Sequence, residues 1–183
     1  MRVLGIDPGM RNMAFCVLDD GAVFDIGNTD LFHGKPIDPK DVCALACLWC
    51  EEHKAYIDSA DVIVCEKQFM DSKIRLSACL IIIQTVIEVF SRSKFIPVHA
   101  MSVKRAYGTI STSHKKNKIK SIERVSAMNP ELFAGVKGKI DDMSDAYLLA
   151  HFYTFHLHQH KKFLCIGQDD NERVETVLAE QSN

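Results

Sequence analysis

The sequence predicts an α/β fold in which a mixed five-stranded sheet is flanked by helices. Two observations support this prediction: three short apolar runs follow one another at the start of the chain, and helical and apolar segments then alternate. The chain has 183 residues, of which 47% are hydrophobic and 25% charged, which favours one folded domain over residues 1–183. We expect its core at about residues 1–160 and an acidic tail at about residues 167–183.

The three initial runs are expected to form a meander of antiparallel strands. They cover residues 3–7, 13–18 and 22–27. The dipeptides Pro8-Gly9 and Asp20-Gly21 separate these runs, and such pairs favour tight turns between neighbouring strands.

The rest of the chain alternates between segments with helical spacing and short apolar segments. We expect strands at residues 61–65 and 95–98, and helices at residues 38–56, 72–90, 115–127 and 141–156. Strands joined through a helix usually pair in parallel, so the later strands should extend the meander into a mixed sheet.

The start of the chain and its most apolar stretch bear on localisation. Met1 leads directly into the first expected strand, which leaves no room for a secretory leader. The stretch at residues 78–89 contains Gln84 and Glu88 and is too short to cross a bilayer. We therefore expect an intracellular protein with no membrane contact.

The seven cysteines are scattered and odd in number, which indicates reduced thiols. Cys43, Cys47 and Cys50 have the spacing of an iron-sulfur motif, but that motif requires a loop and these residues lie in a helical pattern. We interpret them as residues that pack the helix.

Positive charge is concentrated in residues 104–124, although the net charge of the whole chain is only -2. Seven basic residues stand there against Glu123 alone: Lys104, Arg105, Lys115, Lys116, Lys118, Lys120 and Arg124. Such a segment can neutralise several phosphates of a nucleic acid, although a solvated helix face is the alternative interpretation.

Two carboxylates close apolar runs that are expected to be buried strands. Asp7 ends the run Leu4-Gly5-Ile6, and Glu66 ends the run at residues 62–65. Ligands of α/β folds commonly bind where strands end, although a carboxylate that caps a turn is an equally common reading of one such residue.

Asp142 and Asp145 are three positions apart in an expected helix, so their side chains should share one face. A role for Asp141 or Asp142 as an N-cap is the alternative, but it does not account for Asp145. If Asp7 and Glu66 joined this pair, mutual repulsion would favour binding of a hard divalent cation such as Mg2+ or Mn2+. That chemistry suits phosphodiester hydrolysis.

In their order and separation these motifs resemble those of the RuvC-type Holliday junction resolvases. The resemblance rests on Gly5-Ile6-Asp7-Pro8-Gly9 before a meander, Glu66-Lys67-Gln68-Phe69-Met70 after a buried strand, and Asp142-x-x-Asp145-Ala146 on the last helix. It implies an RNase H-like fold of the retroviral integrase superfamily, in which Asp7, Glu66, Asp142 and Asp145 hold two metal ions. It also implies a homodimer that cuts two symmetric strands of a four-way DNA junction.

The resemblance also implies roles for basic and aromatic residues. Val103-Lys104-Arg105 is similar to a basic element of the family, and the segment from Lys115 to Lys118 is similar to the position of a second lysine that touches the scissile phosphate. Phe69 falls where the family has an aromatic that inserts at the junction, although a core position is equally consistent with its type. The lysine-rich tract is most similar to the viral, poxvirus-like branch.

Two other functions use the same residues. A nuclease of the same fold would cut RNA-DNA hybrids or other branched DNA with the same carboxylates, and a non-catalytic module would only bind the junction. The presence of all four carboxylates favours an enzyme.

Overall fold

The computed structural model describes residues 1–71, 76–92, 94–111, 113–134, 136 and 139–157, and it contains the predicted five-stranded sheet. The order of the strands in the sheet is β3-β2-β1-β4-β5. The strands are β1 (Arg2–Asp7), β2 (Met13–Asp19), β3 (Ala22–Thr29), β4 (Val62–Glu66) and β5 (Lys94–Val98). The first three pair antiparallel and the last two run parallel to β1, so the prediction of a mixed sheet is confirmed. The acidic tail lies outside the described residues.

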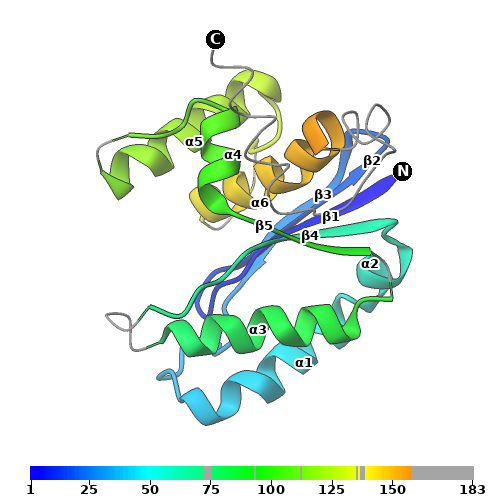
Figure 1. Ribbon diagram of the computed structural model, residues 1–183, viewed down its shortest axis with the longest axis vertical. Coiled ribbons are helices and arrows are strands. Elements are labelled where there is room, and N and C mark those ends of the chain that lie inside the picture. The colour runs from blue at the N-terminus through cyan, green and yellow to red at the C-terminus, as the bar shows by residue number, and fades with distance from the viewer. Residues whose placement is uncertain (72–75, 93, 112, 135, 137–138, 158–183) are drawn as a thin grey trace, which may run out of the picture.

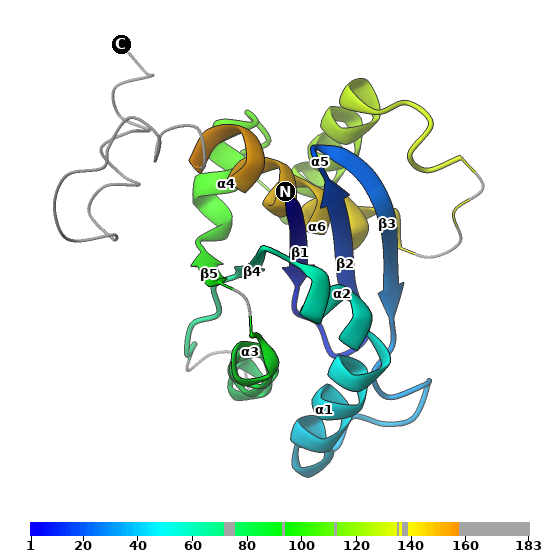
Figure 2. The same ribbon diagram turned by 90° about the vertical axis from the view of Figure 1, so that its right-hand side faces the viewer.

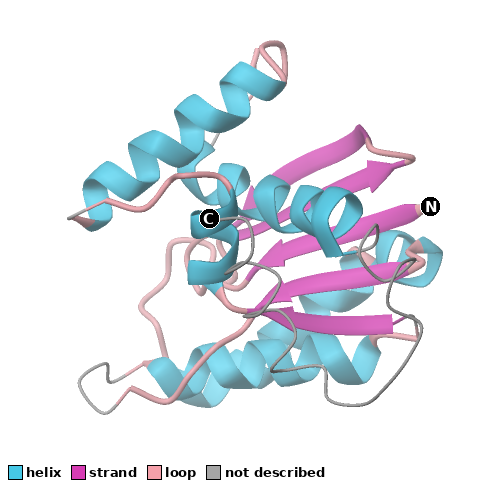
Figure 3. Ribbon diagram, turned by 45° about the horizontal axis from the view of Figure 1, so that its top comes forward, coloured by secondary structure: helices cyan, strands magenta, loops and turns pink. Residues whose placement is uncertain are grey.

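Helices cover both faces of the sheet (Figures 1 and 2). One face carries α1 (Val42–Glu52), α2 (Lys54–Ser59) and α3 (Ser77–Phe90), while the other carries α4 (Ala100–Ala106), α5 (His114–Met128) and α6 (Ile140–Phe152). A 3-10 turn at Pro39–Asp41 precedes α1, and a π-helical turn at Tyr153–Leu157 follows α6. Figure 3 shows the resulting sandwich of sheet between two helical layers.

Alternating residues of each strand form two apolar cores, one on each face of the sheet. In β1, Leu4 and Ile6 face α1 and α3, whereas Val3 belongs to the core beneath α6. Gly5 also faces α6: a Cβ atom there would lie 2.3 Å from the carbonyl oxygen of Ala146 and 2.9 Å from the Cβ of Ala150. The backbones of β1 and α6 therefore approach more closely than any side chain at Gly5 allows.

The edge strand β5 contains Pro97, which is paired in register with Cys65 of β4. The carbonyl of Val98 accepts a hydrogen bond from the amide of Lys67, so Val98 points its backbone groups toward the β4 side. Because backbone groups of successive strand residues point in opposite directions, the nitrogen of Pro97 faces outward from the sheet.

Several predicted boundaries require correction. The helix expected at residues 38–56 is interrupted at His53, whose backbone leaves the helical region and separates α1 from α2. Within α1, Cys50 is buried as expected, but Cys43 is exposed and does not pack against the core. The last helix ends at Phe152 instead of residue 156, and α4 was not predicted at all.

In the described part of the chain, no helix has the length and apolar character needed to span a bilayer.

Candidate active site

Asp7 and Glu66 end adjacent parallel strands and therefore emerge at the same edge of the sheet. Each is the last residue of its strand, β1 for Asp7 and β4 for Glu66. The register pairs Ile6 with Cys65, the residues immediately before them. The strand register thus places the two strand-end acids at neighbouring positions.

Asp142 and Asp145 lie in the first turns of α6, above the end of β1. Small residues of α6 make this placement possible, because Ala146 and Ala150 contact the backbone at Gly5. Asp142 is buried, with a relative exposure of 9%. The fold therefore brings carboxylates from three elements, β1, β4 and α6, toward one region.

The electrostatics of the carboxylates show that they share this region. Burial raises the pKa of Asp7 well above its usual value, and the charges of Glu66, Asp145 and Asp142 raise it further. Burial also raises the pKa of Glu66, and Asp145 adds to that shift. Four acids on two strands and one helix therefore repel one another in a poorly solvated place.

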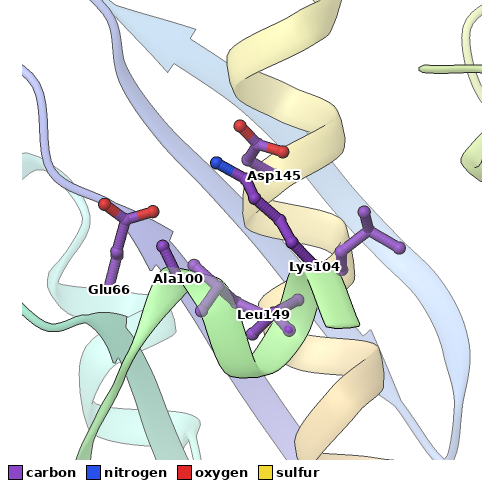
Figure 4. Close-up of a pocket in the computed structure, with 7 residues that line it drawn as sticks. Glu66, Ala100, Lys104, Asp145 and Leu149 are labelled. Atoms are coloured by element: carbon purple, nitrogen blue, oxygen red, sulfur yellow. The ribbon is translucent and has the colours of Figure 1, made fainter. Parts of the chain in front are cut away.

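Lys104 of α4 supplies a compensating positive charge. Figure 4 shows its side chain extending from α4 toward Asp145, with the carboxylate of Glu66 across from them. Burial raises the pKa values of Asp7, Glu66 and Asp145, and the positive charge of Lys104 lowers them in part. Lys104, Glu66 and Asp145 line a small pocket, together with four apolar residues: Ala100, Val103, Leu148 and Leu149.

Lys118 of α5 compensates the other acids of α6. Its ammonium group forms an ion pair with Asp141 and lies 3.0 Å from Oδ1 of Asp142. These hydrogen bonds outweigh the effect of burial and raise the pKa of Lys118. Oδ2 of Asp142 is buried and has no hydrogen-bond partner. The N-cap of α6 is Lys139, so neither Asp141 nor Asp142 has the capping role considered from the sequence.

The residues present fit a hard divalent cation in their chemistry. All four acids offer oxygen, and one oxygen of Asp142 is unpaired. Burial, with a smaller contribution from neighbouring acids, raises the pKa values of Asp7, Glu66 and Asp145. Among the described residues, no three His, Cys, Asp or Glu side chains converge tightly enough to form a finished metal site. Mutual repulsion and the competing lysines provide a physical reason for this open arrangement.

Phe69 lies on the surface, three residues beyond Glu66. Its side chain is 50% exposed, so the core position considered from the sequence is wrong. Its ring centroid lies 5.1 Å from that of His99, and Nζ of Lys67 lies 5.3 Å from the centre of the ring. An exposed aromatic ring beside a cation is suited to stacking on a nucleic-acid base.

The other predicted DNA-contacting residues differ in their surroundings. Arg105, Lys115 and Lys116 are exposed. Lys120 is also exposed, but its ammonium group donates to the carbonyl of Ile110 at 3.0 Å. Only Lys104 and Lys118, of the predicted basic set, lie beside the carboxylates. Sequence spacing alone does not separate the two groups.

Three solved structures have the same arrangement of elements. RuvC of Thermus thermophilus in complex with a Holliday junction substrate gives a TM-score of 0.57 at 14% identity, covering 87% of this chain and 96% of that chain. Another T. thermophilus RuvC structure gives 0.58 at 16% identity, with 87% and 97% covered. The yeast mitochondrial Holliday junction resolvase Ydc2 gives 0.56 at 18% identity, with 89% and 84% covered.

The chain has the RNase H-like fold. At these identities the similarity to RuvC and Ydc2 concerns the fold, with its sheet order and flanking helices. Comparison with protein-family models gives no match, and comparison with curated proteins gives none either.

Sequence reasoning missed two polar residues of α5 that face this RNase H-like site, Asn117 and Ser121. Ser121 is completely buried, and its hydroxyl lies close enough to Asp145 to oppose the rise in that residue's pKa. The two residues are one helical turn apart, a signal that is detectable in the sequence. It was hidden because lysines surround both positions.

Proposed function

We propose that the protein is a Mg2+-dependent endodeoxyribonuclease that resolves four-way Holliday junctions by phosphodiester hydrolysis with paired, symmetric nicks. The observation that carries this proposal is the half-buried group of mutually repelling carboxylates, Asp7, Glu66 and Asp145, beside Lys104. The RNase H-like fold shared with RuvC and Ydc2 supports the choice of substrate class.

Asp7, Glu66, Asp142 and Asp145 would hold the metal, with Mn2+ able to replace Mg2+ and two ions in each site. A bound divalent cation supplies a water nucleophile and charge stabilisation at the phosphoryl group. Movement of the four side chains toward one another is needed first, since they do not yet converge. A bound cation would offset the mutual repulsion of the carboxylates, so its binding favours that movement.

Basic and aromatic side chains would position the DNA. Lys104 and Lys118 lie close enough to the carboxylates to contact the scissile phosphate, with Lys115 as a further candidate. Arg105, Lys116 and Lys120 would contact the phosphate backbone further away, because a duplex is held mainly by such contacts. Phe69 would stack on a base at the junction, where pairing is interrupted.

We also propose that the active species is a homodimer, because a four-way junction offers two equivalent phosphates and a two-fold dimer supplies two matched sites. The many isoleucines of the segment at residues 72–90 exceed what one helix face can turn toward a single core, so we place the interface on α3. Ile83 and Ile87 cannot take part in it, since both are completely buried in the protomer's own core. Ile82 and Val89 are exposed at 37% and 77% and are large apolar residues of α3 that a partner could cover.

Within the family, the lysine-rich α5 leads us to favour the viral, poxvirus-like branch. We infer an intracellular protein, cytoplasmic for a viral enzyme of that branch, where its free thiols would stay reduced.

Cleavage assays test the proposed function directly. Purified protein would be incubated with a mobile four-way junction, a linear duplex and an RNA-DNA hybrid, each with Mg2+, Mn2+ or chelator. We expect metal-dependent, paired nicks in the junction alone. Preferred cleavage of the hybrid would instead indicate an RNase H, and junction binding without cleavage would indicate a binding module.

Two variants make that assay specific to the carboxylates. Asp7→Asn and Asp142→Asn keep the side-chain size but lose the charge that holds a metal, so cutting should fall to background while junction binding persists. Asp58→Asn is the matched control, because Asp58 lies on α2 and pairs with Lys54. Near-normal cleavage by either variant would remove that residue from the proposed metal site.

A further inference from the structure

Three buried oxygen atoms at the boundary between α5 and α6 have no well-formed hydrogen bond, although the hydroxyl of one of them, Ser121, is near enough to Asp145 to oppose the rise in the pKa of that carboxylate. They are Oδ1 of Asn117, Oγ of Ser121 and Oδ2 of Asp142, and in the described residues one other buried side-chain atom, Nε1 of Trp49, shares this condition. Buried polar atoms in native proteins are nearly always satisfied by protein, water or an ion. Their concentration at one boundary therefore indicates something that binds there.

The residues are brought together by the packing of α5 on α6. Asn117 and Ser121 are one turn apart, and one turn further Val125 is completely buried in the core that contains α6. Lys118, the neighbour of Asn117, reaches Oδ1 of Asp142 at 3.0 Å. Ser121 lies near the Asp145 carboxylate, and its hydroxyl opposes the effect of burial on the pKa of that acid.

The chemistry of the three atoms limits what can satisfy them. An amide oxygen and a carboxylate oxygen only accept hydrogen bonds, so Oδ1 of Asn117 and Oδ2 of Asp142 cannot satisfy one another. Ser121 can donate one hydrogen bond, which leaves acceptors in excess. A bound water supplies two donors, and Mg2+ typically keeps several of its waters when carboxylates bind it.

We infer that Asn117 and Ser121 form an outer ligand shell of the cation held by Asp142 and Asp145, and that they accept hydrogen bonds from its waters. This inference rests on the proposed function. Both are positioning residues: Ser121 also fixes the orientation of the Asp145 carboxylate, and Asn117 fixes the water on the Asp142 side. Such partners typically change metal affinity 10- to 100-fold, so roughly that loss is expected when either is removed.

Binding of Mn2+ to the DNA-free protein tests the inference without relying on cleavage. Mn2+ affinity would be measured by electron paramagnetic resonance and calorimetry for wild type, Asn117→Ala and Ser121→Ala. We expect each variant to bind Mn2+ about 10- to 100-fold more weakly. Asn117→Asp, which keeps an acceptor oxygen at this position, should restore binding.

Ser144→Ala is the matched control. Ser144 is also a completely buried serine beside these acids in sequence, but its hydroxyl already donates to the carbonyl of Ile140 at 2.7 Å. Its replacement should lower stability and leave Mn2+ affinity unchanged.

Thermal unfolding separates a metal role from a structural one. Replacement of Ser121 by Ala removes a hydroxyl that acts on the Asp145 carboxylate. Whatever its effect on the metal-free protein, the rise in unfolding temperature on adding Mn2+ should be smaller than for wild type. A variant that binds Mn2+ as wild type does would overturn the inference and leave the carboxylate site standing. Wild-type protein that binds no Mn2+ would overturn the proposed metal site together with it.

Discussion

The phenolic oxygen of Tyr107 lies 2.7 Å from Nδ1 of His151, and this contact joins the end of α4 to α6. Burial, with the charges of His156 and Arg124, lowers the pKa of His151 to about 4, so its imidazole is neutral near pH 7. Burial also raises the pKa of Tyr107, which therefore keeps its proton near pH 7. Which of the two groups donates the hydrogen bond depends on which imidazole nitrogen carries the hydrogen. The bond holds α4, which carries Lys104, against the helix that carries Asp145.

Tyr107→Phe removes this hydrogen bond while it keeps the ring. We expect a loss of about 1 kcal/mol in the free energy of unfolding, the usual net value of one buried hydrogen bond. Urea denaturation of Tyr107→Phe, His151→Phe and the double variant measures the coupling of the pair. Additive losses would show that the two side chains do not stabilise each other.

Asp7→Asn should change how stability depends on pH in the metal-free protein. Because burial and neighbouring acids raise the folded-state pKa of Asp7, the native state binds more protons than the unfolded state above pH ~4. Wild-type stability contributed by this group is therefore lost as pH rises from about 4 toward the folded pKa. The variant lacks that loss and should therefore be more stable than wild type at pH 7.

Urea denaturation in chelator from pH 4 to pH 8 checks this expectation, and added Mg2+ should reduce the advantage of the variant. Asp58→Asn again serves as control. If the free energy of unfolding depended on pH in the same way for Asp7→Asn and wild type, neighbouring acids would not repel the Asp7 carboxylate.

Gly5→Ala tests the close approach of β1 and α6. The added methyl would overlap the carbonyl of Ala146 and the side chain of Ala150, so α6 must shift. Overpacking of this kind costs about 1 to 3 kcal/mol, and a displaced α6 should also weaken Mn2+ binding through Asp142 and Asp145. Denaturation and Mn2+ titration measure the two effects. Wild-type stability and wild-type Mn2+ affinity would mean that the close contact of β1 and α6 does not determine the positions of Asp142 and Asp145.

Lys115→Ala with Lys116→Ala tests the proposed DNA surface of α5. Both side chains are exposed, so stability should change little. The dependence of junction binding on salt should become shallower by about 0.9 units of log-log slope for each duplex phosphate that the variant no longer neutralises. Fluorescence anisotropy from low to moderate salt measures that slope. Lys40→Ala, on the opposite helical layer, should leave it unchanged, and an unchanged slope for the α5 variant would assign these lysines to a solvated face.

Ile82→Glu with Val89→Glu tests the dimer. Both residues are exposed in the protomer, so the chain should fold, but charges at a buried interface should yield a monomer in sedimentation experiments. Phe24→Ser, at an exposed residue of β3, should leave the wild-type state unchanged. In a separate mixture, excess Asp142→Asn exchanged into wild type should convert paired cuts into single nicks. A monomeric wild type that still makes paired cuts would refute the dimer proposal.

Much of the sheet was predictable because its signals are local. The β1–β3 meander follows from turn dipeptides, and β4 follows from an apolar run that ends at Glu66. The break at His53 was missed because it does not interrupt the apolar period of the surrounding helices. The helix α4 was missed because it is too weakly apolar to create such a period. Local patterns do not report where tertiary contacts end a helix.

The site was predictable in its residue types and less so in its contacts. Strand ends and helical spacing nominated Asp7, Glu66, Asp142 and Asp145, and the pattern of pKa shifts shows that these acids interact. The pairing of Lys118 with Asp141 depends on how α5 crosses α6, which no spacing within either helix specifies.

The outward-facing nitrogen of Pro97 has a consequence for how copies of the protein can meet. An edge strand with free amide groups invites the addition of a strand from another molecule, which leads to open-ended aggregation. Pro97 has no amide hydrogen to offer at the centre of β5, so growth of the sheet in that direction is discouraged. The β5 edge is thereby a poor surface for pairing with a second copy, which is consistent with placing the proposed dimer contact on α3 instead.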